Sequence, residues 1–286
     1  MTTIAVTRPS RARTRMSKAL MIAGGLLAAL AGLGCAGLNV QPASFSNIPA
    51  PPASPETVPL PAGLPAPVER FYRQLYGERV PVIRSAVISG RGTMSPVGGI
   101  PFPARFRFTH DAGQGYRHYF ETTVFGLPIM KVNEYYVGGT GRMEMPWGVD
   151  QGERTDQSAN LSMWGEVLAW LPPALLSDPR VSWEPVDDVT ALLVVPFGQA
   201  HERFVVRFDS ATGRPWLFES MRYKGAQGEK TLWLNETLAW GAIGDKTLPA
   251  RSTVTWADDG KPWLVFSIED VAYNVDVETA PPARGP

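Results

Sequence analysis

The sequence predicts an α+β fold that is mostly β: a strongly curved antiparallel sheet, an incomplete barrel of about ten strands, with helices covering its concave face. Two patterns support this prediction. About ten segments alternate apolar and polar residues between turn-forming residues, as half-buried strands do, and two segments carry apolar residues at helical spacing. Short connections favour antiparallel neighbours, and the apolar stripes of the helices need an apolar surface to cover, which a curved sheet supplies.

The amino terminus has the layout of an export signal. Residues 19–34 are uncharged and almost entirely apolar, a basic cluster precedes them, and Cys35 follows directly. Gly34-Cys35 resembles the cleavage site of bacterial lipoproteins, where the leader is cut off and the cysteine is acylated. We therefore expect residues 1–34 to be a signal peptide and Cys35 the site of lipid attachment. An uncleaved anchor and an ordinary secretory leader are the alternatives, and Met16 competes with Met1 as the initiating residue.

Lipid attachment also accounts for the lone cysteine of an exported chain, because acylation consumes the thiol. Several acyl chains hold a protein firmly to a bilayer. Ala36 follows the cysteine, and the resemblance to Gram-negative lipoproteins implies sorting to the outer membrane, since retention at the inner membrane usually needs Asp at that place. The expected location is therefore the envelope, on a membrane that faces the periplasm.

Charge and cysteine content exclude several classes of protein. Lys and Arg together number 27, as do Asp and Glu, but five of the bases precede the first acid, Glu56. Without those five, 22 bases face 27 acids, and such a domain lacks the basic stripe that nucleic acids need. A single cysteine excludes an internal disulfide and leaves no second thiolate for a cysteine-based metal site.

The mature chain divides into a tether, one domain and a tail. Residues 35–61 are rich in Pro, Ala and Ser and almost uncharged, which favours an extended chain without a core. The tail, residues 279–286, is equally poor in apolar residues. We expect a single half-barrel domain over residues 62–278, between a lipid-attached tether and a disordered end.

Two helices are predicted within this domain. The first repeats apolar residues at i, i+3, i+4, i+7 and i+8 from Val68 to Tyr76, and Gly77 is placed to end it. The second spans about residues 160–171, where Leu161, Trp164, Leu168 and Leu171 lie on one stripe. The following Pro172-Pro173 must break this helix or restart a short turn of helix through residue 176.

The remaining segments alternate as strands do. Residues 102–108, for example, place Phe106 and Phe108 on one face and Arg105 and Arg107 on the other. The predicted strands cover residues 102–108, 116–125, 129–137, 191–195, 204–208, 216–223, 231–240, 252–256, 263–268 and 271–277.

The search for a catalytic or metal site finds no complete motif. Neither a serine elbow nor a second ligand one turn after His201 is present, so the sequence predicts no catalytic residues, no metal and no cofactor. His110, at a strand end, His118, in a strand, and His201 are expected to be strand-end or surface polar residues.

Three other polar features have structural interpretations. The glycines of residues 138–141 are expected to form a turn, and Asp187-Asp188 and Asp258-Asp259 are expected in solvated turns, because neighbours in a strand point to opposite faces. Glu166 lies within the second helix between two tryptophans. A buried carboxylate needs a partner, and we expect a structural pair with an arginine on a strand rather than a catalytic role.

Aromatic residues are abundant, with nine Trp, twelve Phe and eight Tyr. Most of them must form the core, but a curved sheet whose helices do not fully seat leaves an apolar trough, which is the default site for a ligand. The residues predicted to line it are Phe106, Phe108, Trp164, Leu168, Leu171, Phe204 and Trp256.

The segment from Trp164 to Val195 resembles a bacterial family of unknown function. The matching features are Glu166 in the helix, the turn at residues 170–176, the strand at Trp183-Glu184, the Asp187-Asp188 turn, the opening helix at residues 64–71, and residues 244–249 before Trp256. The family resembles in fold the periplasmic lipoprotein carriers, incomplete antiparallel barrels closed by helices over a cavity that holds acyl chains. The resemblance implies this fold over residues 62–278, but a fold by itself does not establish transport.

The leading hypothesis is a lipid-anchored envelope protein, not an enzyme, that binds a lipid or an acyl chain in a half-barrel cavity for carriage or sensing. The first alternative is a structural or assembly protein that holds a protein partner through a sheet edge or its loops. The second is an unrecognised hydrolase, for which a carboxylate with a strongly raised pKa in a cleft would be the sign.

Overall fold

The computed structural model describes residues 21–22, 24–25, 32–49, 54–96 and 99–277. Most of the predicted signal peptide and all of the predicted tail lie outside these ranges. Residues 32–38, which include the exposed Cys35, are helical, and residues 41–49 form no regular element. Among the described helices none has both the length and the apolar character required to cross a bilayer.

The first predicted helix is confirmed as α2, Ala66–Tyr76, which begins directly after Pro65 and ends before Gly77 with φ of 74°. Its buried side includes Val68, Phe71 and Tyr72. Two short strands beside it, β1 (Thr57–Pro59) and β2 (Arg79–Pro81), form a separate antiparallel pair. β1 therefore gives regular structure to the end of the segment expected to be a tether.

The domain is built on one antiparallel sheet that is not closed into a barrel. Within the described residues it has 13 strands in the order β8-β7-β6-β5-β4-β3-β15-β14-β13-β12-β11-β10-β9. Their bounds are β3 (Ser85–Met94), β4 (Phe102–Asp111), β5 (Gly115–Val124), β6 (Leu127–Val137), β7 (Thr140–Met145), β8 (Gly148–Gln151), β9 (Ser182–Asp187), β10 (Thr190–Phe197), β11 (Ala200–Phe208), β12 (Pro215–Tyr223), β13 (Lys230–Ile243), β14 (Lys246–Trp256) and β15 (Pro262–Tyr273).

The expected number of about ten strands is too low for physical reasons. β3 lies in the middle of the sheet and its first six residues are all buried, so it lacks the alternation that marks a half-buried strand. β7 and β8 are short and polar at one edge, and β9 forms the opposite edge. Conversely, the predicted strands 263–268 and 271–277 correspond to one strand, β15, with an irregular register after Ile268.

The second predicted helix is α3, Glu153–Trp170, which starts seven residues before its expected position; α4, Pro172–Ser177, restarts after it, as the prolines predicted. The early turns were missed because their buried side chains are polar. Asp156 accepts a hydrogen bond from the amide of Gly141 on β7, and Gln157 donates one to the carbonyl of Met221 on β12. These side chains replace an apolar stripe as the contact with the sheet.

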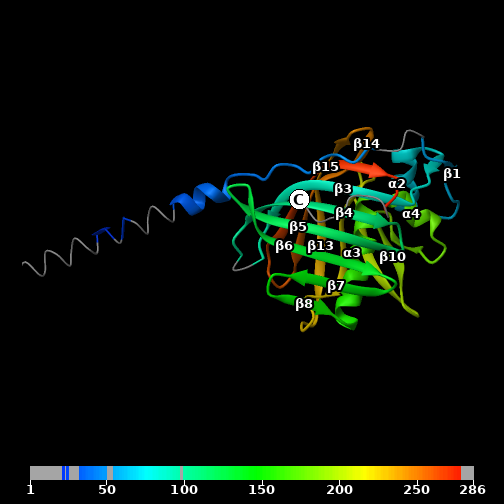
Figure 1. Ribbon diagram of the computed structural model, residues 1–286. Coiled ribbons are helices and arrows are strands. Elements are labelled where there is room, and N and C mark those ends of the chain that lie inside the picture. Colours follow the sequence, from blue (N-terminus) through cyan, green and yellow to red (C-terminus); the bar gives the residue numbers. More distant parts are fainter. Residues whose placement is uncertain (1–20, 23, 26–31, 50–53, 97–98, 278–286) are drawn as a thin grey trace, which may run out of the picture.

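The contacts of α3 show that the sheet curves strongly. β7 and β12 are second and tenth in the strand order, and in a flat sheet they would lie about 38 Å apart at a spacing of about 4.8 Å. A single helix about 10 Å wide contacts both, so the sheet bends around α3 (Figure 1). α2 packs instead against β2 and β10, and covering of the whole concave face by helices remains a prediction.

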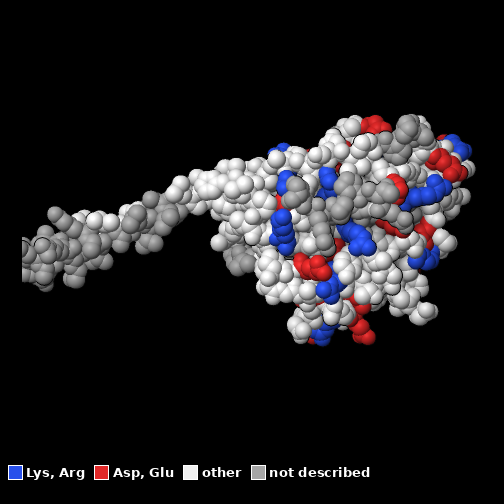
Figure 2. All heavy atoms as spheres, in the orientation of Figure 1, with Lys and Arg blue, Asp and Glu red and all other residues white. Residues whose placement is uncertain are grey.

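The Pro-rich segment before the domain contacts the outer face of the sheet. The ring of Phe45 lies under the guanidinium groups of Arg105 and Arg107, at 4.4 Å and 4.7 Å, and Arg107 donates a hydrogen bond to the carbonyl of Ser46. Arg105 and Arg107 thus lie on the face opposite the core residues Phe106 and Phe108, as predicted. Figure 2 shows that the arm leading to the domain carries no charged side chain where it is described, whereas charges of both signs are interspersed over the domain.

A buried hydrogen bond connects α2 to the junction between α3 and α4. Tyr72 donates its hydroxyl to the carbonyl of Pro172 at 2.7 Å, and both residues are buried. We expect Tyr72→Phe to lower the free energy of unfolding by about 1–3 kcal/mol, because it leaves that carbonyl unpaired in the core. Urea denaturation followed by tryptophan fluorescence measures this change. Tyr135→Phe is the matched control, since the Tyr135 hydroxyl makes no hydrogen bond within the described residues, and equal losses would contradict the assignment.

Candidate functional site

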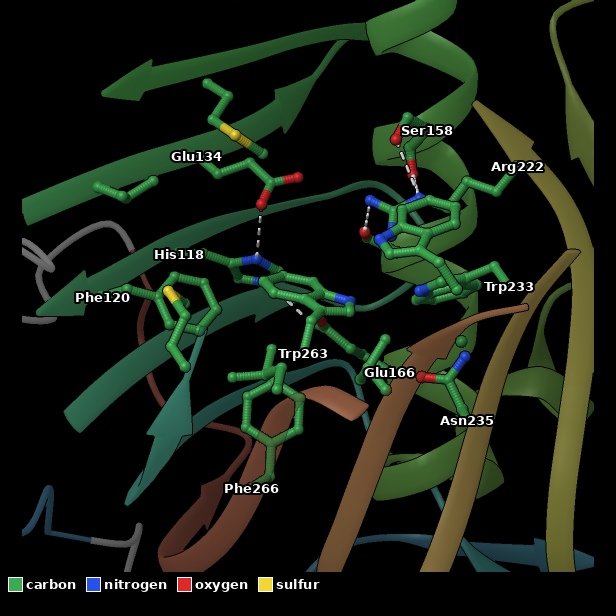
Figure 3. A pocket seen from close by; sticks show the side chains of 18 of the residues that line it. His118, Phe120, Glu134, Ser158, Glu166, Arg222, Trp233, Asn235, Trp263 and Phe266 are labelled. Carbon is green, nitrogen blue, oxygen red and sulfur yellow. Dashed lines mark hydrogen bonds and ion pairs between the residues drawn. The ribbon is translucent and has the colours of Figure 1, made fainter. Parts of the chain in front are cut away.

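A cavity of about 430 Å³ lies within the curve of the sheet. It is lined by α3 and by strands from both halves of the sheet (Figure 3), and turns at one end of the strands, here called its mouth, complete the lining. In an antiparallel meander every second turn falls at the same end. The mouth accordingly includes Pro96 after β3, Trp147 between β7 and β8, Gly225 between β12 and β13, and Asp259 between β14 and β15.

Most of the wall is apolar and much of it is adaptable. Four methionines contribute to it, namely Met94, Met130, Met143 and Met145, and methionine side chains adjust readily to irregular shapes. The aromatic lining residues are Phe120, Trp147, Trp170, Phe218, Trp233, Trp256, Trp263 and Phe266. On α3, Gly165 also faces the cavity, and a Cβ there would lie only 3.2 Å from the Phe218 ring and 3.3 Å from that of Trp233. Its lack of a side chain lets the helix lie close to these rings.

One of the seven residues predicted to line a ligand site, Trp256, lies in this wall. The other six are deeply buried in the core around the cavity and are absent from its lining: Phe106, Phe108, Trp164, Leu168, Leu171 and Phe204. Phe108, for example, packs edge-to-face against Phe120 and Phe266, which reach the cavity, and beside Phe106, which does not. Ligand contact by the predicted residues remains a prediction.

Two buried histidines and Glu166 meet at the inner end of the cavity. Phe108 pairs with His118 across β4 and β5, so His110, two residues further along β4, is the diagonal neighbour of His118 on the same face. The Nε2 atoms of His110 and His118 lie 2.8 Å and 2.7 Å from Oε2 of Glu166 on α3. His110 lies next to the end of β4, as predicted, but His110 and His118 are 0% and 2% exposed, so neither is a surface residue; only His201 is exposed.

The expected arginine partner of Glu166 is therefore replaced by this pair of imidazoles. Burial alone raises the pKa of Glu166, but the charge of His118 and its contacts with both histidines outweigh burial and lower it. Burial lowers the pKa of His110. It also opposes the charged form of His118, but the adjacent carboxylates of Glu166 and Glu134 prevail and raise the pKa of His118 to about 9.

Glu134 on β6 faces His118 from the other side (Figure 3). Its Oε2 lies 3.7 Å from Nδ1 of His118, and its Oε1 accepts a hydrogen bond of 2.6 Å from the hydroxyl of Tyr116, whose ring stacks on His118. Burial raises the pKa of Glu134, but His118, Arg222 and Tyr116 together lower it. Both carboxylates at the inner end thus favour the ionised form, and the raised pKa that would signal a hydrolase is not found in either.

Arg222 on β12 adds a second buried cation, only 6% exposed. Its guanidinium donates hydrogen bonds to the carbonyl and hydroxyl of Ser158 and to the hydroxyl of Ser162, both on α3, and lies 4.4 Å from the centre of the Trp233 ring. Burial lowers the pKa of Arg222, and the charge of Glu134 opposes that change. Arg222 forms no ion pair within the described ranges, so it offers a positive charge and free donor capacity to the cavity.

The cavity therefore combines an apolar trough with a polar inner end, an arrangement suited to an amphiphilic molecule. Two features of the sequence could have indicated this site. Phe102–Asp111 and Gly115–Val124 alternate so that each histidine falls on the same face as the buried phenylalanines, and Glu166 lies on the buried side of a helix. Their convergence was missed because it depends on the register of β4 and β5 and on the direction from which α3 enters the sheet.

The planar Arg222 guanidinium, which binds Ser158 and Ser162 at the same time, should be essential for the packing of α3 against β12. We expect Arg222→Lys to lower the free energy of unfolding by about 1–3 kcal/mol, because an ammonium cannot reach Ser158 and Ser162 together and leaves polar groups unpaired. The control is Arg117→Lys, at an exposed arginine over the Tyr135 ring, which should change stability by less than about 0.5 kcal/mol. Chemical denaturation of both variants measures the difference, and an equally small effect at Arg222 would show that the guanidinium is dispensable.

Comparisons with known proteins give the following relationships. A family model described as a family of unknown function, DUF6544, matches residues 54–268. The search of curated proteins finds no match. The chain is similar in structure to the LolA superfamily protein NE2245 from Nitrosomonas europaea, with 10% identity and a TM-score of 0.45, over 75% of this chain and 96% of that one.

It is also similar to a DUF1329 family protein from Desulfovibrio piger, with 12% identity and a TM-score of 0.39, over 68% of this chain and 87% of that one. Both TM-scores are below 0.5, and similarity at this level carries no information on ligand or activity.

Proposed function

The chain belongs to the DUF6544 family, whose function is unknown, and we propose from its cavity that it is an envelope protein that binds the hydrophobic part of a lipid or an acyl chain. Membership confirms the resemblance to a family of unknown function. In this proposal the protein is not an enzyme. It carries or senses its ligand in the half-barrel, and acylated Cys35 holds it to the membrane.

The observation that carries this proposal is the open apolar interior. A volume of about 430 Å³ lies within the range of about 300–1,000 Å³ that small-molecule sites occupy. Its wall is dominated by methionine and aromatic side chains, which bind flexible apolar chains of varied shape. Such binding gains about 25 cal/mol for each Å² of apolar surface removed from water, without requiring directional contacts along the chain.

The position of the mouth is suited to exchange with a membrane. The segment that follows Cys35 reaches the domain at the β5–β6 turn, where the amide of Phe125 donates a hydrogen bond of 2.9 Å to the carbonyl of Gly37. Alternation of the antiparallel strands puts this turn at the same end of the sheet as the mouth (Figure 1). Exposed apolar side chains gather at this end, including Leu127, Ile129 and Trp147, the first and third of which are more than 60% exposed.

Filling the cavity should displace a bound lipid. Ala169 lies on α3 and lines the wall, so Ala169→Phe places a ring in the apolar space. We expect the full chain carrying Cys35→Ser to retain about one extractable lipid per protein after purification in mild detergent, and Ala169→Phe in that background to retain less than about one fifth as much, since the ring takes the space of the chain. Lipid extraction with mass spectrometry measures both ratios.

The matched control is Ala211→Phe, which puts the same ring in an exposed turn. It should retain lipid as the parent does. Lipid loss in Ala211→Phe equal to that in Ala169→Phe, or a lipid-free parent, would refute binding in this cavity.

The anchor is tested separately by fractionation of cells. We expect the wild-type chain to fractionate with membranes, and Cys35→Ser with a cleavable secretory leader in place of residues 1–34 to move to the soluble periplasmic fraction, because several buried acyl chains, each worth about 0.8 kcal/mol per CH₂, supply the attachment. Mass spectrometry of the mature amino terminus should show acylated Cys35 as the first residue. An intact leader on the membrane-bound wild-type chain would establish the uncleaved anchor instead.

A further inference from the structure

The two histidines and Glu166 at the inner end of the cavity have a geometry that ion pairing alone does not explain. Both imidazole Nε2 atoms lie within 2.8 Å of Glu166 Oε2, yet none of these three atoms makes a hydrogen bond of acceptable geometry within the described residues. A short N···O distance without alignment of the N–H bond is expected when both atoms face a shared point rather than each other. The two rings are inclined by 60°, with centroids 5.6 Å apart.

We propose that His110, His118 and Glu166 form a binding site for one divalent transition-metal ion of the zinc class. One donor atom from each residue lies within 4.8 Å of the other two. Donors placed about 2.0–2.1 Å from a common tetrahedral ion are separated by about 3 Å or slightly more, so each Nε2–Oε2 distance would lengthen by a few tenths of an ångström and the two Nε2 atoms, which lie within 4.8 Å of each other, would settle at a similar separation. Two imidazoles and one carboxylate are ligands that Zn²⁺ favours, and binding displaces the proton from His118.

The surroundings provide what such a site needs beyond its ligands. Glu134 faces the second nitrogen of His118 and is itself held by Tyr116, the arrangement that orients a ligating histidine. His118 and Glu166 line the cavity while His110 lies behind them, so the open coordination position faces the cavity. A water molecule or an oxygen of the bound amphiphile can occupy that position. The ion would then bind the polar end of the ligand whose apolar part lies in the trough.

The site is tested with zinc alone, so its outcome is independent of lipid binding. The full chain with Cys35→Ser, without a histidine tag, is stripped with a chelator and titrated with ZnCl₂ against a fluorescent zinc indicator. We expect one equivalent to bind, with affinity lowered more than 100-fold in His118→Ala and in Glu166→Gln, and by about 10–100-fold in Glu134→Gln, which removes only the orienting charge. His201→Ala, at an exposed histidine on β11, should bind as the parent does.

A second readout does not depend on any variant folding correctly. Titration of the parent with CoCl₂ should produce visible absorption bands of a nitrogen- and oxygen-ligated ion, at one equivalent, that ZnCl₂ abolishes. Circular dichroism shows whether each variant remains folded. The proposal is overturned if the parent binds neither metal, or if folded His118→Ala binds zinc as tightly as the parent does.

Discussion

The whole architecture depends on one helix being held by strands from both halves of an open sheet. Polar contacts hold the first turns of α3, and tryptophans pack at its end. Asp156 accepts a hydrogen bond from the amide of Gly141 on β7, and Gln157 and Ser158 donate hydrogen bonds to carbonyls of β12. Because these strands are eight places apart in the sheet, the sheet must curl, and curling creates the cavity. The same helix supplies Glu166 to the inner end and Gly165 and Ala169 to the wall.

Buried charge at the inner end is the physical cost of this arrangement, and the cluster offsets it internally. Transfer of an isolated carboxylate or guanidinium from water into the interior is strongly unfavourable. Here Glu134 and Glu166 flank His118, and the hydroxyls of α3 bind Arg222, so each charged group has a partner of opposite charge or a hydrogen-bond acceptor. A purely apolar core would be simpler to stabilise. The polar inner end is therefore a feature that demands a functional explanation, which the proposed ligand with one polar end would provide.

Sequence patterns predict the amphipathic elements of this fold better than its buried ones. Alternation identified the strand around Phe106 and Phe108, and helical spacing identified α2, because each of these elements carries apolar side chains on one face and mostly polar ones on the other. β3, whose first six residues are all buried, and the polar early turns of α3 were not predicted, because neither shows an apolar face opposite a polar one. The site was more difficult to predict than the fold. His110, His118 and Glu166 belong to no motif in the sequence, and only the strand register and the direction of the helix bring them together.

The aromatic residues illustrate the same limit. The abundance of aromatic residues predicts a trough but not which rings line it: Trp256 reaches the cavity, while Phe204 and Trp164 are enclosed in the core.

The most direct test of the central claim is a crystal structure of the full chain with Cys35→Ser, purified together with cellular lipid. The account predicts continuous elongated electron density between Trp233, Trp263 and Phe266. An interior closed by rotated side chains, with no space for a chain, would contradict it.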